Sequence, residues 1–212
     1  MEKREHVFGL VVVVVVLVWL NVCSATLSPA GVNYEVVALM AIKQDIKDPH
    51  NVLDSWDFSS VDPCSWRMVT CTSDGSVFAL GMPDQNLSGT LSPAIENLSN
   101  LQSIMLQDNA ISGSIPGAIG KLRKLQTLDL SGNKFSGALP SSFGDLKNLN
   151  LLRLNNNSLT GPVPHSLSEL GSLTLVDLSY NNLSGLLPKI SARTFKIIRN
   201  PLLCEHNSET SQ

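Results

Sequence analysis

The sequence is poor in aromatic and charged residues. Only 5% of its 212 residues are aromatic and 16% are charged, while 43% are hydrophobic. A core therefore has to be built mainly from Leu, Ile and Val, because few large rings are available. The net charge is −3 and no clustered basic face is evident, which argues against nucleic acid as a partner, since phosphate binding needs such a face.

Histidine is also scarce, and its placement does not fit the common catalytic arrangements. The four His residues lie far apart, and none falls in a motif with Ser, Cys or paired acids. The glycines and the lysine at residues 113–121 have the wrong spacing for a phosphate-binding loop. We therefore expect no enzymatic activity, no catalytic residue and no cofactor.

A long apolar run occurs only at the N-terminus. Residues 7–20 carry no polar side chain, follow the basic pair Lys3 and Arg4, and precede the small residues Ser24 and Ala25. This layout predicts a secretory signal peptide at 1–25 with cleavage after Ala25. An uncleaved membrane anchor is the alternative, but the run is short beside the roughly 20 residues that a spanning helix needs.

Cysteine is rare, and its count becomes odd once the signal is removed. Cys64, Cys71 and Cys204 remain in the oxidising secretory context. A disulfide between Cys64 and Cys71 is favoured. A zinc site is not, because no second thiol pair or His pair accompanies them. We expect no metal, and a free Cys204 that is open to intermolecular pairing.

From Val77 onward the sequence repeats with a period of 24 residues. Asparagine, glycine, apolar and proline residues each recur in this one register. The rows are Asn109, Asn133, Asn157 and Asn181; Gly89, Gly113, Gly137, Gly161 and Gly185; Met82, Leu106, Leu130, Leu154 and Leu178; and Pro116, Pro140, Pro164 and Pro188. Such a period is typical of leucine-rich repeats. The predicted fold class is an α/β repeat, a short right-handed leucine-rich-repeat solenoid of five repeats.

The spacing within one repeat predicts a strand followed by a turn. Leu125, Leu128 and Leu130 place apolar side chains on the inner face of a short strand. Asn133 follows where the backbone loses its ladder partners, and a buried Asn can donate and accept there. One such residue per repeat forms a hydrogen-bonded column. Its predicted members are Gln85, Asn109, Asn133, Asn157 and Asn181.

Both ends of a solenoid need caps, because no repeat buries its apolar rows alone. Residues 33–46 predict an amphipathic helix with Asn33 as N-cap. Trp56 and the Cys64–Cys71 bridge can then close the first coil. The expected domains are a signal peptide at 1–25, a helical, disulfide-pinned N-terminal cap at 26–76, five repeats at 77–190 and an incomplete C-terminal cap at 191–212.

Several motifs together resemble a known family. They are the segment Val61-Asp-Pro-Cys-Ser-Trp66, repeats of the Leu-Ser-Gly-x-Ile-Pro kind, the segment Arg153-Leu-Asn-Asn-Asn-Ser-Leu-Thr160, and the tail from Ala192 to Cys204. The chain resembles the ectodomain of plant leucine-rich-repeat receptor-like kinases of the somatic-embryogenesis and NSP-interacting kinase group. The resemblance covers residues 30–205.

The resemblance implies a receptor or co-receptor ectodomain that binds another leucine-rich-repeat receptor, or an extracellular protein or peptide ligand. In the steroid co-receptors of this group, tyrosines of the second repeat contact ligand and partner. Ser103 and Gln107 stand at the matching positions here, so the NSP-interacting branch is the closer match. Kinase activity does not carry over, because the sequence has no kinase domain.

Location and completeness also follow from the resemblance. It implies secretion to the apoplast, or the plasma membrane for a full-length receptor that reaches it through a C-terminal part. In the family, the cysteine after Asn-Pro-Leu has a partner several residues downstream, and Cys204 has none before Gln212. We therefore expect an incomplete copy of a longer receptor, or else a natural soluble decoy.

Four Asn-x-Ser sequences are candidate N-glycosylation sites in a secreted chain. They are Asn86, Asn97, Asn156 and Asn182. Asn182 is expected to be hindered by its neighbour, the column residue Asn181.

Candidate partner-binding residues project from the concave face. Asp129, Arg153 and Asp177 share one strand position in consecutive repeats and predict an acid–base–acid row. The row is either a docking strip or, as we favour, mutual neutralisation worth about 0–1 kcal/mol. The remaining candidates on this side are Met105, Gln107, Asp108, Asn155 and Tyr180. Two functions compete: a receptor-type recognition module, and a secreted inhibitor of an extracellular enzyme.

Overall fold

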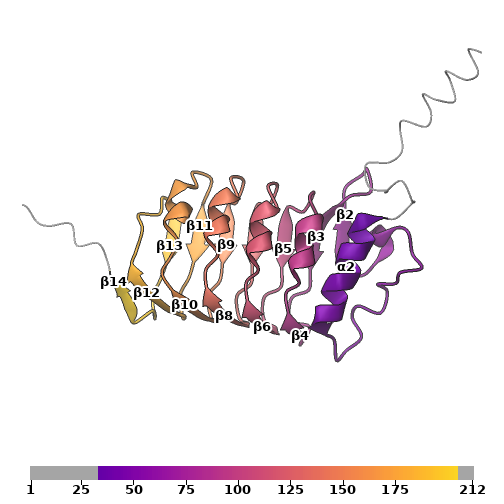
Figure 1. Ribbon diagram of the computed structural model, residues 1–212, viewed down its shortest axis with the longest axis horizontal. Helices are drawn as coiled ribbons and strands as arrows, with labels where there is room; N and C mark the ends of the chain where they lie inside the picture. Colours follow the sequence, from indigo (N-terminus) through magenta and orange to yellow (C-terminus); the bar gives the residue numbers. More distant parts are fainter. Residues whose placement is uncertain (1–32, 205–212) are drawn as a thin grey trace, which may run out of the picture. The chain divides into compact units, whose positions relative to one another are not determined.

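The structure, a computed structural model, describes residues 33–204. The chain divides into two compact units, residues 1–34 and 35–212, and the description below concerns the second. The predicted signal peptide lies outside the described residues. In residues 35–204 the chain winds into successive coils that stack side by side (Figure 1).

The N-terminal part is built around one helix. Helix α2 (Tyr34–Asp45) confirms the helix predicted at 33–46, and it buries Leu39 and Ile42 completely. After it come β1 (Ile46–Lys47), the 3₁₀ helix η1 (Pro63–Ser65) and β2 (Val69–Cys71). The rings of Trp56 and Trp66 stack with their centroids 5.8 Å apart. The predicted disulfide between Cys64 and Cys71 is formed.

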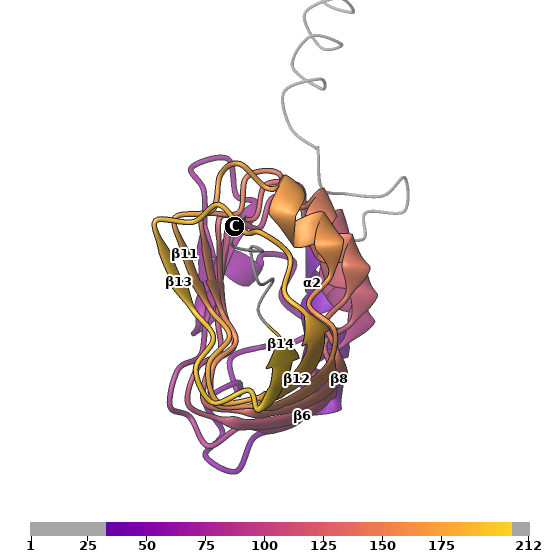
Figure 2. The ribbon, with the colours of Figure 1, turned by 90° about the vertical axis from the view of Figure 1, so that its left-hand side faces the viewer.

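Two seven-stranded sheets run along the stack (Figure 2). One, here called the front sheet, has the order β13-β11-β9-β7-β5-β3-β2. Its repeat strands are β3 (Val77–Gly81), β5 (Ser103–Met105), β7 (Thr127–Asp129), β9 (Leu151–Arg153), β11 (Leu175–Asp177) and β13 (Thr194–Lys196). They begin coils 1 to 6 and pair in parallel, whereas β2 pairs with β3 antiparallel.

The other sheet, here called the side sheet, has the order β1-β4-β6-β8-β10-β12-β14. It contains β4 (Ser88–Thr90), β6 (Ala110–Ser114), β8 (Lys134–Ala138), β10 (Ser158–Gly161), β12 (Asn182–Leu186) and β14 (Leu202–Cys204). Short 3₁₀ helices lead back to the front sheet: η2 (Pro93–Asn97), η3 (Gly117–Lys121), η4 (Ser141–Asp145) and η5 (His165–Glu169).

The apolar rows of the repeat form one continuous core. In coils 2 to 5 the middle residue of the front strand points inward, as Leu128, Leu152 and Val176 show with no exposed surface. Their strand neighbours point outward because side chains alternate along a strand. The 24-residue period thus packs the same side chain against its own equivalent in the next coil. The predicted solenoid is confirmed.

The asparagine column is present in the core. Asn133 donates from Nδ2 to the carbonyls of Leu106 at 2.8 Å and Leu130 at 3.2 Å, and its Oδ1 accepts the N–H of Ile111 at 3.0 Å. Asn109, Asn157 and Asn181 make equivalent bonds. Each asparagine therefore ties its own coil to the preceding one.

Gln85 does not extend this column. Its Nε2 donates to the carbonyls of Pro83 and Asp84 in its own turn, at 2.7 and 3.0 Å. Within residues 33–204 its side chain bonds to no other coil, so the column role predicted for Gln85 is wrong. The reason is that β2 precedes coil 1 as an antiparallel strand, so no equivalent coil offers it a backbone partner.

Candidate binding surface

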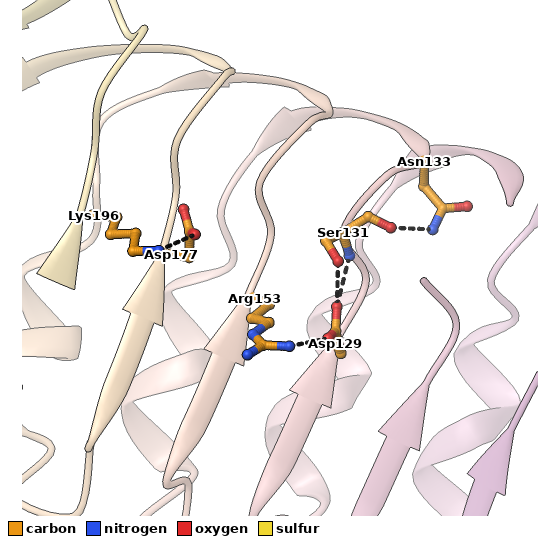
Figure 3. Close-up of polar contacts among 6 residues, drawn as sticks. All are labelled: Asp129, Ser131, Asn133, Arg153, Asp177 and Lys196. Carbon is orange, nitrogen blue, oxygen red and sulfur yellow. Dashed lines mark hydrogen bonds and ion pairs between the residues drawn. The ribbon is translucent and has the colours of Figure 1, made fainter. Parts of the chain in front are cut away.

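The outward side of the front sheet corresponds to the predicted concave face and carries a charged row. Register places Asp129 beside Arg153, Arg153 beside Asp177, and Asp177 beside Lys196. Figure 3 shows these side chains on adjacent strands. The sequence missed Lys196, because coil 6 departs from the 24-residue period that the other coils follow.

The row pairs its charges two by two. Arg153 Nη1 lies 3.4 Å from Asp129 Oδ2, and Lys196 Nζ lies 4.0 Å from Asp177 Oδ2. The cations remain accessible, with 44% of the Arg153 side chain and 59% of the Lys196 side chain exposed. Such pairs contribute about 0–1 kcal/mol. The geometry agrees with mutual neutralisation and leaves both cations within reach of a partner.

Asp129 differs from the exposed docking residue that the sequence suggested. Asp129 is only 4% exposed. Its Oδ1 accepts the backbone N–H and the hydroxyl of Ser131, at 3.1 and 2.5 Å (Figure 3). Asp177 repeats part of this pattern by accepting the N–H of Ser179 at 3.0 Å. Asp129 thus closes the strand-end turn and positions Arg153.

The other predicted contact residues are spread over coils 2 to 5. Met105 is 37% exposed and Tyr180 is 50% exposed. Asp108 is exposed, while Gln107 and Asn155 are half-buried. Met105 is the register partner of Asp129 and so adjoins the charged row, whereas the other four residues follow the ends of their front strands.

Asp108 and Tyr180 share a structural constraint. Both have a positive φ, near 58° and 55°, and each stands just before a column asparagine. Positive φ is uncommon outside glycine, so these two positions are fixed by the turn that the column stabilises.

All four predicted glycosylation asparagines are exposed. Asn86 and Asn156 lie in turns that follow front strands, Asn97 ends η2, and Asn182 begins β12. The strands of the front sheet carry none of the four. Asn182 is exposed although its neighbour Asn181 is buried.

A buried carboxylate joins the cap to coil 1. Glu35 is 4% exposed, and each of its oxygens lies 3.1 Å from the backbone N–H of Val77, which donates to it. Burial raises the pKa of this carboxyl, the hydrogen bond from Val77 lowers it, and the charge of Asp74 raises it. At the surface, hydrogen bonds from Ser59 lower the pKa of Asp57.

The last coil holds a small hollow and the remaining cysteine. A cavity of about 230 Å³ is lined by Leu187, Ile197, Ile198, Arg199, Asn200, Leu203 and Cys204. Cys204 is free and exposed.

In residues 33–204 no group of three or more His, Cys, Asp or Glu is arranged to hold a metal. No helix in that range has the length and apolar character to cross a bilayer.

Comparison with known proteins identifies the family. A family model described as "Leucine-rich repeat region" matches residues 77–189, and one described as "Leucine rich repeat N-terminal domain" matches residues 32–72. The chain belongs to the leucine-rich repeat family. "Leucine-rich repeat protein 1" from Oryza sativa subsp. indica is 44% identical over 77 residues, which is 36% of this chain and 36% of that protein.

Among solved structures, this leucine-rich repeat chain is similar to plant receptor ectodomains. The structure titled as the BIR3–SERK2 complex from Arabidopsis thaliana matches with a TM-score of 0.67 at 32% identity, over 80% of this chain and 97% of that one. The SOBIR1 receptor kinase ectodomain from the same plant matches with a TM-score of 0.69 at 30% identity, over 81% of this chain and 95% of that one. The structure of PEPR1 with AtPEP1 matches with a TM-score of 0.70 at 37% identity, over 72% of this chain and 22% of that one.

The extent of these matches varies. The chain spans 36% of the length of its curated rice relative and 22% of the PEPR1 chain, but nearly all of the SOBIR1 ectodomain. The fold is therefore that of plant receptor kinase ectodomains.

Proposed function

We propose that this chain is an extracellular recognition module, the ectodomain of a plant receptor or co-receptor of the leucine-rich-repeat receptor-like kinase type. The partner is another leucine-rich-repeat ectodomain or an extracellular protein or peptide. The observation that carries the proposal is the front sheet, where Arg153 and Lys196 stay accessible on strands without a glycosylation sequence. Structures titled as complexes of similar ectodomains with peptides or with each other support it.

The NSP-interacting branch remains the proposed subgroup. It rests on the segments shared with that group and on Ser103 and Gln107 at the positions where the steroid co-receptors carry tyrosines. A soluble decoy and a secreted inhibitor of an extracellular enzyme are the alternatives. The front sheet serves all three functions, and partner identity separates them.

Delivery to the outside is tested by expressing the tagged chain in plant cells. We expect a secreted product that begins near Thr26 and loses mass on deglycosylation, because all four candidate asparagines are exposed. A cytosolic product of bare polypeptide mass with Met1 intact would contradict the proposal.

Recognition is tested by measuring binding to immobilised plant leucine-rich-repeat ectodomains, with BIR3 and SERK2 in the panel. We expect saturable binding that Arg153→Glu weakens. Arg123→Glu is the matched control, because Arg123 also pairs with an aspartate, Asp145 at 3.1 Å, away from the front sheet. Inhibition of a cell-wall hydrolase without binding to any ectodomain would favour the inhibitor alternative.

A further inference from the structure

Two leucines stand at an outward position of the front sheet. Leu151 on β9 and Leu175 on β11 are register partners, so they lie side by side, roughly 4.8 Å apart along the sheet. Both are half-buried, whereas the next residues, Leu152 and Val176, have no exposed surface. Alternation along the strand therefore directs Leu151 and Leu175 away from the core.

The core does not require leucine at this position. In the other coils, the same register position is held by small residues: Ala79, Ser103, Thr127 and Thr194. Threonine is therefore compatible with the fold on both sides of the pair. An adjacent apolar pair at a position that is otherwise small or polar favours a surface that contacts a partner.

The surroundings of the pair are basic on balance. The outward and turn positions of coils 4 to 6 carry Arg153, Lys196 and Arg199 against the single acid Asp177, and all three cations are exposed. The corresponding positions of coils 1 to 3 carry acids and no cation: Asp84, Asp108 and Asp129. The positive charge and the leucine pair thus both lie in the C-terminal half of the front sheet, whereas the exposed Met105 lies in coil 2.

Both cations next to the pair have donors to spare. Arginine has five N–H donors, and Arg153 uses one on Asp129 at 3.4 Å. Lysine has three, and Lys196 reaches Asp177 only at 4.0 Å. A carboxylate held beside the leucines would be partly desolvated there, which strengthens its charge-assisted hydrogen bonds.

We propose that Leu151, Leu175, Arg153, Asp177 and Lys196, here called the leucine strip, bind an extended peptide segment that carries an apolar residue next to a carboxylate. This rests on the proposed function and names the chemistry of the partner. An extended segment of about seven residues spans roughly 23 Å. This length is close to the five strand spacings between β3 and β13 of the front sheet. The peptide is therefore expected to lie across the strands of the front sheet and not along one of them.

A second copy of the chain fits this surface less well. If two front sheets met antiparallel about their centres, the basic half of one would face the acidic half of the other. The leucines, however, would then face Ser103 and Thr127 rather than each other. Apolar side chains gain little from burial against hydroxyl groups, so a peptide with its own apolar residue is the better occupant.

The test selects a random heptapeptide phage library on the secreted chain and measures the enriched peptides by fluorescence polarisation. We expect enriched peptides that pair Leu, Ile, Val or Phe with Asp or Glu. The double variant Leu151→Thr/Leu175→Thr should bind them about tenfold or more weakly, because it removes apolar contact from two side chains. Lys196→Glu, made in the parent chain, should weaken the binding of acidic peptides and leave the binding of peptides without an acid unchanged.

Leu186→Thr is the control. It replaces the same residue type by threonine at an exposed position of the side sheet, where Leu186 is 66% exposed. It should leave peptide binding unchanged. Absence of enrichment, equal binding of acidic and basic peptides, or an unchanged double variant would overturn the leucine strip. So would a dimer in light scattering that the double variant abolishes, which would assign the strip to a second copy. Binding to a receptor ectodomain without any peptide binding would remove this inference and leave the proposed function standing.

Discussion

Asn200 Oδ1 accepts the backbone N–H of Leu183 at 3.0 Å. Its Nδ2 also donates to the carbonyl of Leu178 at 2.9 Å. Asn181 makes the same two bonds to Leu159 and Leu154. The asparagine column therefore continues into coil 6, beyond the last repeat that the period of the sequence reveals.

Replacing a column residue should destabilise the solenoid. Asn133→Leu leaves the N–H of Ile111 without its side-chain acceptor in a buried site, which costs about 1–3 kcal/mol, while the carbonyl of Leu106 keeps its hydrogen bond from Asn109 Nδ2 at 3.0 Å. Lys134→Ala is the control at an exposed neighbour and should cost under about 0.5 kcal/mol. Chemical denaturation measures both, and equal midpoints would show that Asn133 has no such role.

Asn200→Leu should loosen the C-terminal coil without unfolding the rest. The bonds of Asn200 tie coil 6 to Leu178 and Leu183, and a solenoid opens locally from its ends. Hydrogen exchange should therefore quicken in β13 and β14 and stay unchanged in β5 and β7. Exchange as slow as in the parent chain would mean that other contacts hold this coil.

Gly89→Ala should separate the cap helix from coil 1. A Cβ on Gly89 would lie 2.2 Å from the carbonyl oxygen of Asp45, and the residue has a φ of +98°. Gly75→Ala is the matched control, because Gly75 also has a positive φ, +81°, but meets nothing within 4 Å. The control should lose about 1 kcal/mol from its backbone alone, and Gly89→Ala an additional 1–3 kcal/mol or so from overpacking. Thermal melting of the two variants compares them, and similar losses would contradict the close contact.

The pH dependence of stability should report on Glu35. Because burial raises the pKa of its carboxyl above the ordinary value of 4.5, its contribution is most favourable below that value and is lost as pH rises through the folded-state pKa. Glu35→Gln cannot ionise, so its melting temperature relative to the parent should increase between about pH 4 and pH 7. A difference that stays constant or falls over this range would show that the ionised form is not penalised.

Cys204 should be the one thiol of residues 33–204 that reacts with a maleimide without denaturant, since Cys64 and Cys71 are bridged and Cys204 is exposed. Mass spectrometry should find one adduct on these residues and none in Cys204→Ser. Labelling of Cys64 or Cys71 in the oxidised protein would contradict the bridge.

The sequence was informative where one physical requirement recurs in every coil. Leu128 and Asn133 could be placed from spacing, because a buried strand needs an inward apolar residue and its turn needs a donor and acceptor. Gln85 was wrongly included in the asparagine column and Asn200 was missed, for opposite reasons. Gln85 keeps the register but has no preceding coil to bond, whereas Asn200 follows Asn181 outside the register and still finds the same backbone groups.

The sequence alone determined the repeat, the inward rows, the cap helix and the cysteine pair, since each follows from local periodicity or from the scarcity of alternatives. The tertiary structure decided which outward residues act together. Leu151 and Leu175 are far apart in the chain and become neighbours only through sheet register. Asp129 likewise turned from a surface candidate into a buried support for Arg153. Exposure and pairing depend on the neighbouring coil, whose side chains the pattern of a single repeat does not specify.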